Sequence, residues 1–259
     1  MASKAGLLSV AAFVGGLLGC GMNHGQEGES DLAIVGGELV TGTSPVAKST
    51  VALLTPEGHT FCTGTLIEKS LVVTAAHCLD NYSADHVYVA FGPNQRRPVA
   101  SLLRRSTSFR IHQSFSMAAM ETEGQPVNDI ALVRLEEAAP GGYTPATALT
   151  QGQALKVGEP LILAGFGLTA SSSKATGTLY EVVTALVKED RTAKEIVFGG
   201  HPGKSACRGD SGGPAYATRG AAIVLLGVTS RGSSKCDQFG IYTDVRFFRP
   251  WLTEAAATL

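Results

Sequence analysis

The chain has 259 residues, 44% of them hydrophobic and 17% charged, with 31 glycines and a formal net charge of −1. A low share of charged residues and abundant glycine favour a loop-rich, mostly β protein over a helical one. Because neither sign of charge forms a long run, the sequence argues against a nucleic-acid or polyanionic partner.

Residues 1–20 are typical of a secretory signal peptide. Lys4 supplies a positive charge, and residues 5–18 form an apolar stretch that is too short to span a bilayer comfortably. The sequence Leu-Leu-Gly-Cys that follows resembles a bacterial lipobox, in which Cys20 becomes lipidated and attaches the protein to a membrane. An ordinary signal peptide with a chance cysteine is the alternative, and both interpretations place the protein outside the cytoplasm.

Residues 21–33 are small, polar and acidic, which predicts a tether or propeptide ahead of a folded domain at 34–259. From Ile34 onward, short β-like runs alternate with turn residues, a pattern that favours a β-barrel or a β-sandwich. Strands are predicted at 49–54, 70–75, 86–91, 129–135, 160–167, 181–187, 221–230 and 240–245.

A loop-like stretch at 137–160, rich in glycine and proline, divides the predicted strands into two lobes at roughly 34–140 and 155–247. The last residues, FFRPWLTEAAATL, have helical character. Pro250 is best placed in the first turn of that helix, where a missing N–H breaks no hydrogen bond. We therefore expect a two-lobed β domain that ends in a helix.

The cysteines support export. Without Cys20 an even number remains, which suits two disulfides in an oxidising compartment. The remaining cysteines are Cys62, Cys78, Cys207 and Cys236. A zinc site would require closer ligand spacing, and the sequence contains neither CxxC nor HExxH, so no metal or cofactor is predicted.

Three short segments carry residues suited to nucleophilic catalysis. TAAHC places His77 at the end of a predicted strand, NDIAL places Asp129 at the start of another, and CRGDSGGP surrounds Ser211 with glycines. Serine is a poor nucleophile until an imidazole takes its proton, and the imidazole requires a carboxylate to fix its tautomer. The match of GDSGG to the lipase motif GxSxG is a chance one, because lipases have the order Ser, Asp, His.

These segments, preceded by IVGG at 34–37, together resemble the trypsin-like (chymotrypsin-family) serine proteases from Ile34 to about Trp251. The resemblance implies an all-β fold of two packed six-stranded antiparallel β-barrels with a C-terminal helix. It implies no cofactor, and it places the catalytic residues in the cleft between the barrels.

The resemblance also implies a role for each residue of the three segments. Ser211 is the nucleophile, His77 the general base and then the general acid, and Asp129 the group that holds His77. The backbone N–H groups of Gly209 and Ser211 form the oxyanion hole. The implied disulfides are Cys62–Cys78, which ties down the loop bearing His77, and Cys207–Cys236, which joins the walls of the substrate pocket.

The implied substrate pocket is neutral. Ser205 matches its base, Gly232 and Gly240 match its walls, and Ser230 and Gly232 can pair their backbone with an extended substrate. A neutral base disfavours lysine or arginine before the cleaved bond (the P1 residue) and favours a large apolar one. An inward-turned Asp237 would restore an acidic pocket, but aspartate is usually exposed.

Two arginines complicate the neighbouring subsites. Arg231 stands where the family typically has tryptophan, and Arg208 adjoins Gly209. Either arginine could favour acidic substrate residues, and a solvated side chain is the default for both.

The resemblance further implies activation by cleavage before Ile34, whose new α-amino group would pair with the buried Asp210. Because Ala33 precedes the cut, the activating protease should accept a small residue. The predicted function is that of an exported serine endopeptidase made as a zymogen, with protein or peptide substrates. The alternative is a catalytically silent binding module on the same fold, which the intact catalytic segments disfavour.

Overall fold

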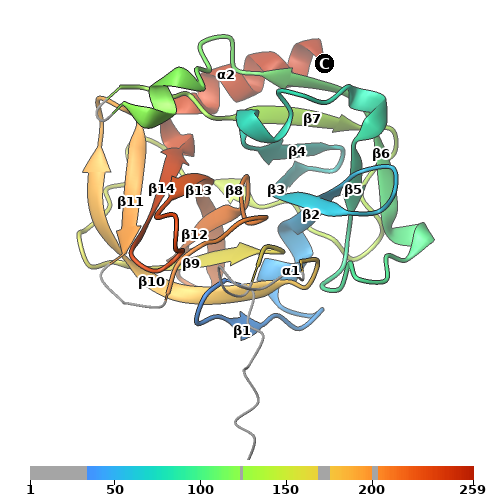
Figure 1. Cartoon of the computed structure of the whole chain (residues 1–259), viewed down its shortest axis with the longest axis horizontal. Helices are drawn as coiled ribbons and strands as arrows, with labels where there is room; N and C mark the ends of the chain where they lie inside the picture. The colour runs from blue at the N-terminus through green and yellow to red at the C-terminus, as the bar shows by residue number, and fades with distance from the viewer. Residues whose placement is uncertain (1–33, 123–124, 169–175, 200–203) are drawn as a thin grey trace, which may run out of the picture. The chain divides into compact units, whose positions relative to one another are not determined.

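The computed structural model describes residues 34–122, 125–168, 176–199 and 204–259 (Figure 1). The predicted signal peptide with Cys20 and the predicted tether at 21–33 lie outside the described residues. Regular structure is mostly strand, in agreement with the predicted fold class. Within the described ranges, no helix is long and apolar enough to cross a membrane.

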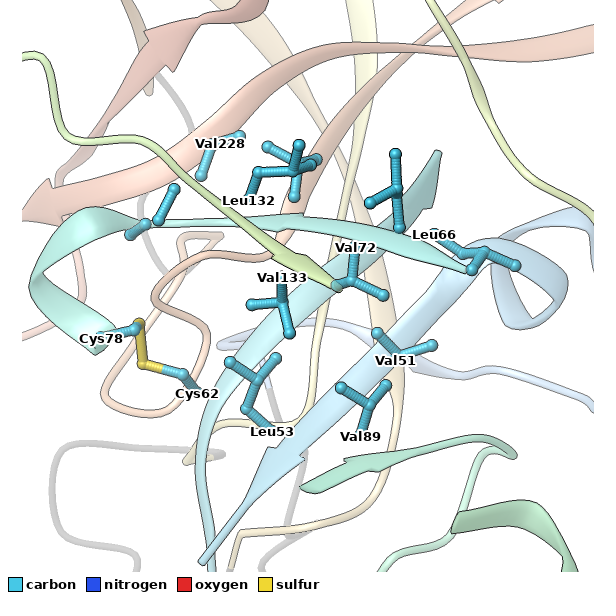
Figure 2. Close-up of a cluster of buried hydrophobic side chains, with 14 of the residues drawn as sticks. Val51, Leu53, Cys62, Leu66, Val72, Cys78, Val89, Leu132, Val133 and Val228 are labelled. Atoms are coloured by element: carbon cyan, nitrogen blue, oxygen red, sulfur yellow. A yellow bond between two sulfur atoms is a disulfide. The ribbon is translucent and has the colours of Figure 1, made fainter. Parts of the chain in front are cut away.

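Six antiparallel strands of the first half close into a barrel in the order β2-β3-β4-β7-β6-β5. These strands are β2 (Thr50–Leu54), β3 (Thr60–Glu68), β4 (Leu71–Thr74), β5 (Tyr88–Ala90), β6 (Leu103–Ile111) and β7 (Ala131–Leu135). Alternate side chains of a strand point to the same face, so Val51 and Leu53 of β2 share one face with Val89 of β5. All three are fully buried in the apolar cluster of Figure 2.

Six strands of the second half close in the same manner, in the order β10-β11-β14-β13-β12-β9, with β9 pairing back to β10. They are β9 (Pro160–Gly165), β10 (Tyr180–Asp190), β11 (Glu195–Gly199), β12 (Pro214–Arg219), β13 (Ala222–Gly232) and β14 (Phe239–Asp244). Two short strands are added: β1 (Glu38–Leu39) pairs with β10, and β8 (Thr147–Ala148) pairs in parallel with β13. The two closed six-stranded barrels confirm the predicted architecture.

Every predicted strand range overlaps an observed strand, but the barrel strands β3, β6, β11 and β12 and the short strands β1 and β8 have no counterpart among those ranges. In β6, with the sequence LRRSTSFRI, most side chains are half-buried and the burial does not alternate. Such a strand is held by pairing with its neighbours β5 and β7 in the closed barrel, which leaves little trace in a local hydrophobic pattern.

The predicted C-terminal helix is present as α2 (Val245–Thr258), and it starts earlier than predicted. Asp244 caps its first turn by accepting the backbone N–H of Arg246. Pro250 therefore lies inside the helix, not in its first turn, and removes one helical hydrogen bond. Burial of Phe248 and Trp251 against the core offsets this loss.

The remaining helical elements are short. The first, α1 (Pro45–Ser49), is capped by Ser44, whose hydroxyl accepts the backbone N–H of Val46. Single 3₁₀ turns occur at η1 (Ala76–Cys78), η2 (Ala84–His86), η3 (Ala100–Leu102) and η4 (Ala118–Glu121).

The two barrels are joined by buried polar contacts as well as by apolar packing. The hydroxyl of Tyr216, in β12, lies 2.8 Å from the Ser49 hydroxyl and 3.0 Å from the Thr50 hydroxyl. The second barrel therefore contributes one fully buried phenol and the first half contributes both of its partners, which fixes β12 of the second barrel against β2 of the first.

Candidate active site

His77 and Asp129 are brought together at one end of the first barrel. His77 lies in η1, directly after β4, and Asp129 lies just before β7, the neighbour of β4 in the barrel. The ring Nδ1 of His77 is 2.8 Å from Oδ2 of Asp129, and the His77 backbone N–H donates to Oδ1 at 3.0 Å. With Nδ1–H donated to the carboxylate, Nε2 is left as a proton acceptor.

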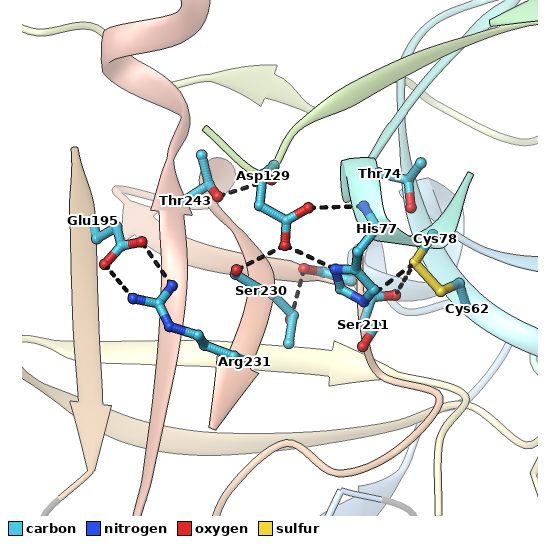
Figure 3. A network of polar contacts seen from close by, with 12 residues as sticks. Cys62, Thr74, His77, Cys78, Asp129, Glu195, Ser211, Ser230, Arg231 and Thr243 are labelled. Atoms are coloured by element: carbon cyan, nitrogen blue, oxygen red, sulfur yellow. Dashed lines mark hydrogen bonds and ion pairs between the residues drawn. A yellow bond between two sulfur atoms is a disulfide. The ribbon is translucent and has the colours of Figure 1, made fainter. Parts of the chain in front are cut away.

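Asp129 is fully buried, and two further hydroxyl groups bond to its side chain and its backbone (Figure 3). The Ser230 hydroxyl donates to Oδ2 at 2.7 Å, and the Thr243 hydroxyl donates to the Asp129 backbone carbonyl at 2.8 Å. Sequence reasoning assigned Ser230 only to the substrate pocket and missed Thr243. The signal that pointed toward such partners was the cost of burying an aspartate without hydrogen bonds.

Ser211 lies beside the His77 ring, on the side away from Asp129 (Figure 3). Its backbone carbonyl accepts the N–H of Thr63 at 2.8 Å, which ties the serine to the first barrel. Among the described residues, no hydrogen bond joins the Ser211 hydroxyl to His77. Catalytic hydrogen bonds are often long before substrate binds and tighten in the complex.

The backbone around Ser211 depends on glycine. Gly209 has φ +94°, and a Cβ there would lie 2.8 Å from the Cα of Gly167. Only glycine adopts this conformation without strain, and only glycine fits that space. The N–H groups of Gly209 and Ser211 donate to none of the residues that the structure describes, so both are available to a ligand.

Asp210 is buried and is 1% exposed. Its carboxylate accepts the backbone N–H groups of Gly167 and Cys207, both at 2.8 Å. A Cβ at Gly165 or at Gly167 would overlap this carboxylate, so the two glycines provide the space for it. Burial raises the pKa of Asp210 to about 7, although the two N–H donors act in the opposite direction.

Ile34, the predicted new N-terminus, lies in the core of the second barrel. Its side chain is fully buried, and the N–H of Val35 donates to the Ser205 carbonyl at 3.1 Å. In the uncleaved chain, where Ala33 precedes Ile34, no hydrogen bond or ion pair within the described ranges joins Ile34 to Asp210. No described cation pairs with the Asp210 carboxylate.

A pocket of about 220 Å³ opens beside Ser211. Its lining consists of Ala206, Cys207, Arg208, Ser211, Thr229, Ser230, Arg231, Gly232, Ser233, Ser234 and Cys236. Of the residues predicted to form the substrate pocket, Ser230 and Gly232 therefore line it. Three larger cavities lined by described residues contain none of the residues predicted to act in catalysis.

Ser205 and Gly240, the other two predicted pocket residues, are buried but are not in the lining. Ser205 bridges to Val35, and its hydroxyl bonds to the Ala206 carbonyl. Gly240 pairs with Gly232 across β14 and β13. The base predicted at Ser205 and the wall predicted at Gly240 therefore stay predictions.

The acidic alternative for the pocket involves Asp237. Its side chain accepts the hydroxyl of Ser233 at 3.2 Å, and the Asp237 N–H donates back to that hydroxyl at 3.0 Å. Asp237 is not among the lining residues, and within the described chain the lining contains no carboxylate.

The expectation that Arg231 is solvated is wrong. Its guanidinium forms a bidentate ion pair with Glu195 in β11 of the same barrel, with N–O distances of 2.7 and 3.0 Å (Figure 3). The Glu195 side chain is only 8% exposed, so the pair is partly shielded from water. The charge of Arg231 is therefore matched within the protein and does not await a substrate.

Both expected disulfides are present. Cys62 bonds to Cys78, next to His77, and Cys207 bonds to Cys236, which places the second bridge in the pocket wall. The sulfurs of Cys62 and Cys78 and a ring nitrogen of His77 lie within 4.8 Å of one another. Because the two sulfurs are bonded to each other, they cannot supply the thiolates that a metal would require.

Two closed antiparallel barrels, with a histidine, an aspartate and a serine gathered between them, are the features of two-barrel serine proteases. The trypsin family model matches residues 34–252, and the chain therefore belongs to the trypsin family of serine proteases.

The chain is similar to several curated members of this family. It is 30% identical to coagulation factor XII from Sus scrofa over 92% of this chain and 42% of that protein. It is 27% identical to kallikrein-4 from Homo sapiens over 84% of this chain and 90% of that protein. Trypsin alpha from Drosophila erecta is 27% identical over 93% and 94% of the two chains. The chain spans about two fifths of the length of the factor XII relatives.

Proposed function

We propose that this protein is an exported serine endopeptidase that hydrolyses peptide bonds through an acyl-enzyme. The observation that carries the proposal is the buried Asp129 carboxylate, both oxygens of which bond to His77, with Ser211 beside the same ring. The two disulfides are typical of proteins from an oxidising compartment and support export.

In the proposed mechanism, His77 Nε2 takes the proton of the Ser211 hydroxyl as the oxygen attacks the substrate carbonyl. Asp129 holds the ring through Nδ1–H and stabilises the imidazolium that forms. The N–H groups of Gly209 and Ser211 stabilise the negative charge on the substrate oxygen. The imidazolium then gives its proton to the leaving amine, and a water molecule, activated by the same ring, releases the acyl group.

A fluorophosphonate probe tests this function. The active form of the protein should be labelled at Ser211, and both Ser211→Ala and His77→Ala should lose the label while remaining folded. A folded wild-type protein that takes up no label would favour the alternative, a binding module without catalytic activity.

The proposed P1 preference is for a large apolar residue rather than a basic one. It is supported by a pocket without a lining carboxylate and by the engagement of Asp237 with Ser233. A peptide library that varies P1 should show preference for Phe, Tyr, Leu or Met. Strong preference for Arg or Lys would contradict the proposed pocket.

The proposed activation is cleavage before Ile34 by a protease that accepts a small residue. It is supported by the buried Ile34 side chain and by the lack of a described cation for Asp210. N-terminal sequencing of the active form should begin at Ile34, and active protein that retained residues 21–33 would contradict the proposal.

Attachment to a membrane through a lipidated Cys20 is the proposed localisation, with release into the medium as its alternative. Replacement of Cys20 by serine should then move the protein from the membrane fraction to the soluble fraction. An unchanged distribution would favour the ordinary signal peptide.

A further inference from the structure

A buried hydroxyl of the first barrel reaches the loop that carries Ser211. It belongs to Thr63 in β3, a residue that is fully buried. The hydroxyl donates to the Gly209 carbonyl at 2.9 Å and accepts the backbone N–H of Phe166 at 3.1 Å. The Thr63 backbone N–H donates to the Ser211 carbonyl at 2.8 Å. One residue thus contacts both residues whose N–H groups face the substrate oxygen in the proposed mechanism.

The direction of each donor N–H follows from the carbonyl of the same peptide unit. A peptide unit is planar and trans, so its C=O and N–H point in opposite directions, and fixing one aims the other. The carbonyl before Gly209, that of Arg208, accepts the N–H of Leu168 at 2.7 Å. The carbonyl before Ser211 accepts the N–H of Gly213 at 2.8 Å. The two peptide units that supply the donor N–H groups (the donor units) are therefore each held by a hydrogen bond at the carbonyl end.

The middle unit, Gly209–Asp210, connects these two donor units. Its N–H donates to the Cys207 carbonyl at 3.0 Å, and its carbonyl accepts the Thr63 hydroxyl. Gly209, at φ +94°, has no side chain to restrict its backbone, and glycine moves between conformations more readily than any other residue. The Thr63 hydroxyl therefore adds a bond from outside the loop, which restrains this unit and, through it, the two N–H groups on either side.

The geometry points to Thr63 as a positioning residue for the oxyanion hole. It acts through its hydroxyl, which fixes the Gly209–Asp210 peptide from the opposite barrel and so keeps the N–H groups of Gly209 and Ser211 aimed at one point. This inference rests on the proposed endopeptidase function. Thr63 does not touch the reacting atoms, and its effect should appear only in steps that place negative charge on the substrate oxygen.

The test compares Thr63→Val, which keeps the shape but removes the hydroxyl, with Thr63→Ser, which keeps the hydroxyl. Thr50→Val is the matched control, because it removes another fully buried threonine hydroxyl of the same barrel that bonds to Tyr216 and not to the loop. The kcat of each variant is calculated per fluorophosphonate-reactive site, so that unfolded protein does not enter the enzyme concentration.

For Thr63→Val we expect kcat to fall about tenfold with KM nearly unchanged, because the lost bond matters in the transition state. The Ki of a peptide trifluoromethyl ketone, whose adduct places an oxyanion in the hole, should rise by a similar factor. The Ki of a reduced-amide peptide of the same sequence should stay constant, because that compound has no oxygen at this position. Thr63→Ser should restore most of kcat, and Thr50→Val should leave it unchanged.

Three outcomes would overturn the inference: wild-type kcat and ketone Ki in Thr63→Val, equal impairment in Thr63→Ser, or an equal loss in Thr50→Val. If Thr63→Val does not fold, Thr63→Cys replaces it in the comparison. Its kcat should fall about threefold, because a thiol is a weak donor. A wild-type protein that never reacts with the fluorophosphonate would refute the proposed function itself, which is a separate result.

Discussion

The buried carboxylate of Asp210 should make the uncleaved chain less stable as pH rises. The perturbation is Asp210→Asn, introduced into a Ser211→Ala background so that the protein cannot cleave itself. In the folded, uncleaved chain, burial raises the pKa of Asp210 to about 7, and the only described partners of its carboxylate are two backbone N–H groups. Folding therefore favours the protonated, neutral form of this side chain.

The sign and the size of the effect follow from linkage. A group whose pKa is higher in the folded than in the unfolded chain stabilises the fold fully below the unfolded pKa, and this contribution is lost as pH rises through the folded pKa. With an ordinary value of 3.8 in the unfolded chain and about 7 in the folded one, the Asp210 contribution should fall by about 3 kcal/mol between pH 5 and pH 8.

Asparagine cannot ionise at position 210, so the variant should lack this pH dependence. It carries a constant cost, because its NH₂ group must face one of the two backbone N–H donors that the carboxylate accepts. The unfolding free energy of the Asp210→Asn variant should therefore rise relative to that of the protein with Asp210 as pH rises. Other carboxyl groups with raised pKa values, such as Glu181, are present in both proteins and cancel in the comparison.

The assay is urea unfolding at pH 5, 6, 7 and 8, followed by the fluorescence of Trp251, the single tryptophan, which lies in α2 with its side chain buried. If the difference in unfolding free energy between the two proteins does not change with pH, the reasoning is refuted. Protein cleaved before Ile34 serves as the control, because a new α-amino group would meet the ionised carboxylate and preserve stability at pH 8.

Three further predictions follow from close contacts in the site. Gly167→Ala should prevent activation and lower the yield of folded protein, because its Cβ would lie 2.6 Å from backbone atoms. Gly152→Ala is the control: its Cβ would lie in open space, so this variant should match wild type in fluorophosphonate labelling and in thermal unfolding. Replacing Cys207 and Cys236 together by serine should lower the unfolding free energy by about 3–4 kcal/mol, and a change below about 1 kcal/mol in urea would contradict the loop-closure argument for a 29-residue separation. Ser230→Ala should lower kcat about tenfold, because a charge-assisted donor to the catalytic carboxylate is lost, and an unchanged kcat would show that this bond is dispensable.

The sequence was sufficient to predict the fold and the three candidate catalytic residues because the relevant patterns are local. His77, Asp129 and Ser211 each lie within a segment of a few residues, next to a strand end or a glycine turn. The short strand-like runs left a β-barrel or a β-sandwich open, and the family resemblance of the three segments implied the two barrels that are present. A short run of residues is enough to predict a feature whose geometry is set by a single strand or a single turn.

The polar partners of the site could not be predicted in this way. The bond from Ser230 to Asp129 joins residues 101 apart in sequence, and that from Thr63 to Gly209 joins residues 146 apart. Each requires knowledge of how strands are ordered and in what register, which a local pattern does not contain. The same reason explains Arg231, whose partner Glu195 follows only from the pairing of β11, β14 and β13.

The contacts of the Ser211 loop also indicate what the proposed activation must supply. In the uncleaved chain the loop is already held by Thr63 from one barrel and by Gly167 and Leu168 from the other. What the described residues do not offer is a positive charge for Asp210. Because the hydrogen-bonded scaffold is formed before cleavage, the new N-terminus would act mainly by allowing that buried carboxylate to stay ionised. The proposed activation is then an electrostatic step on a largely preformed loop, and its energetic signature is the pH dependence that Asp210→Asn removes.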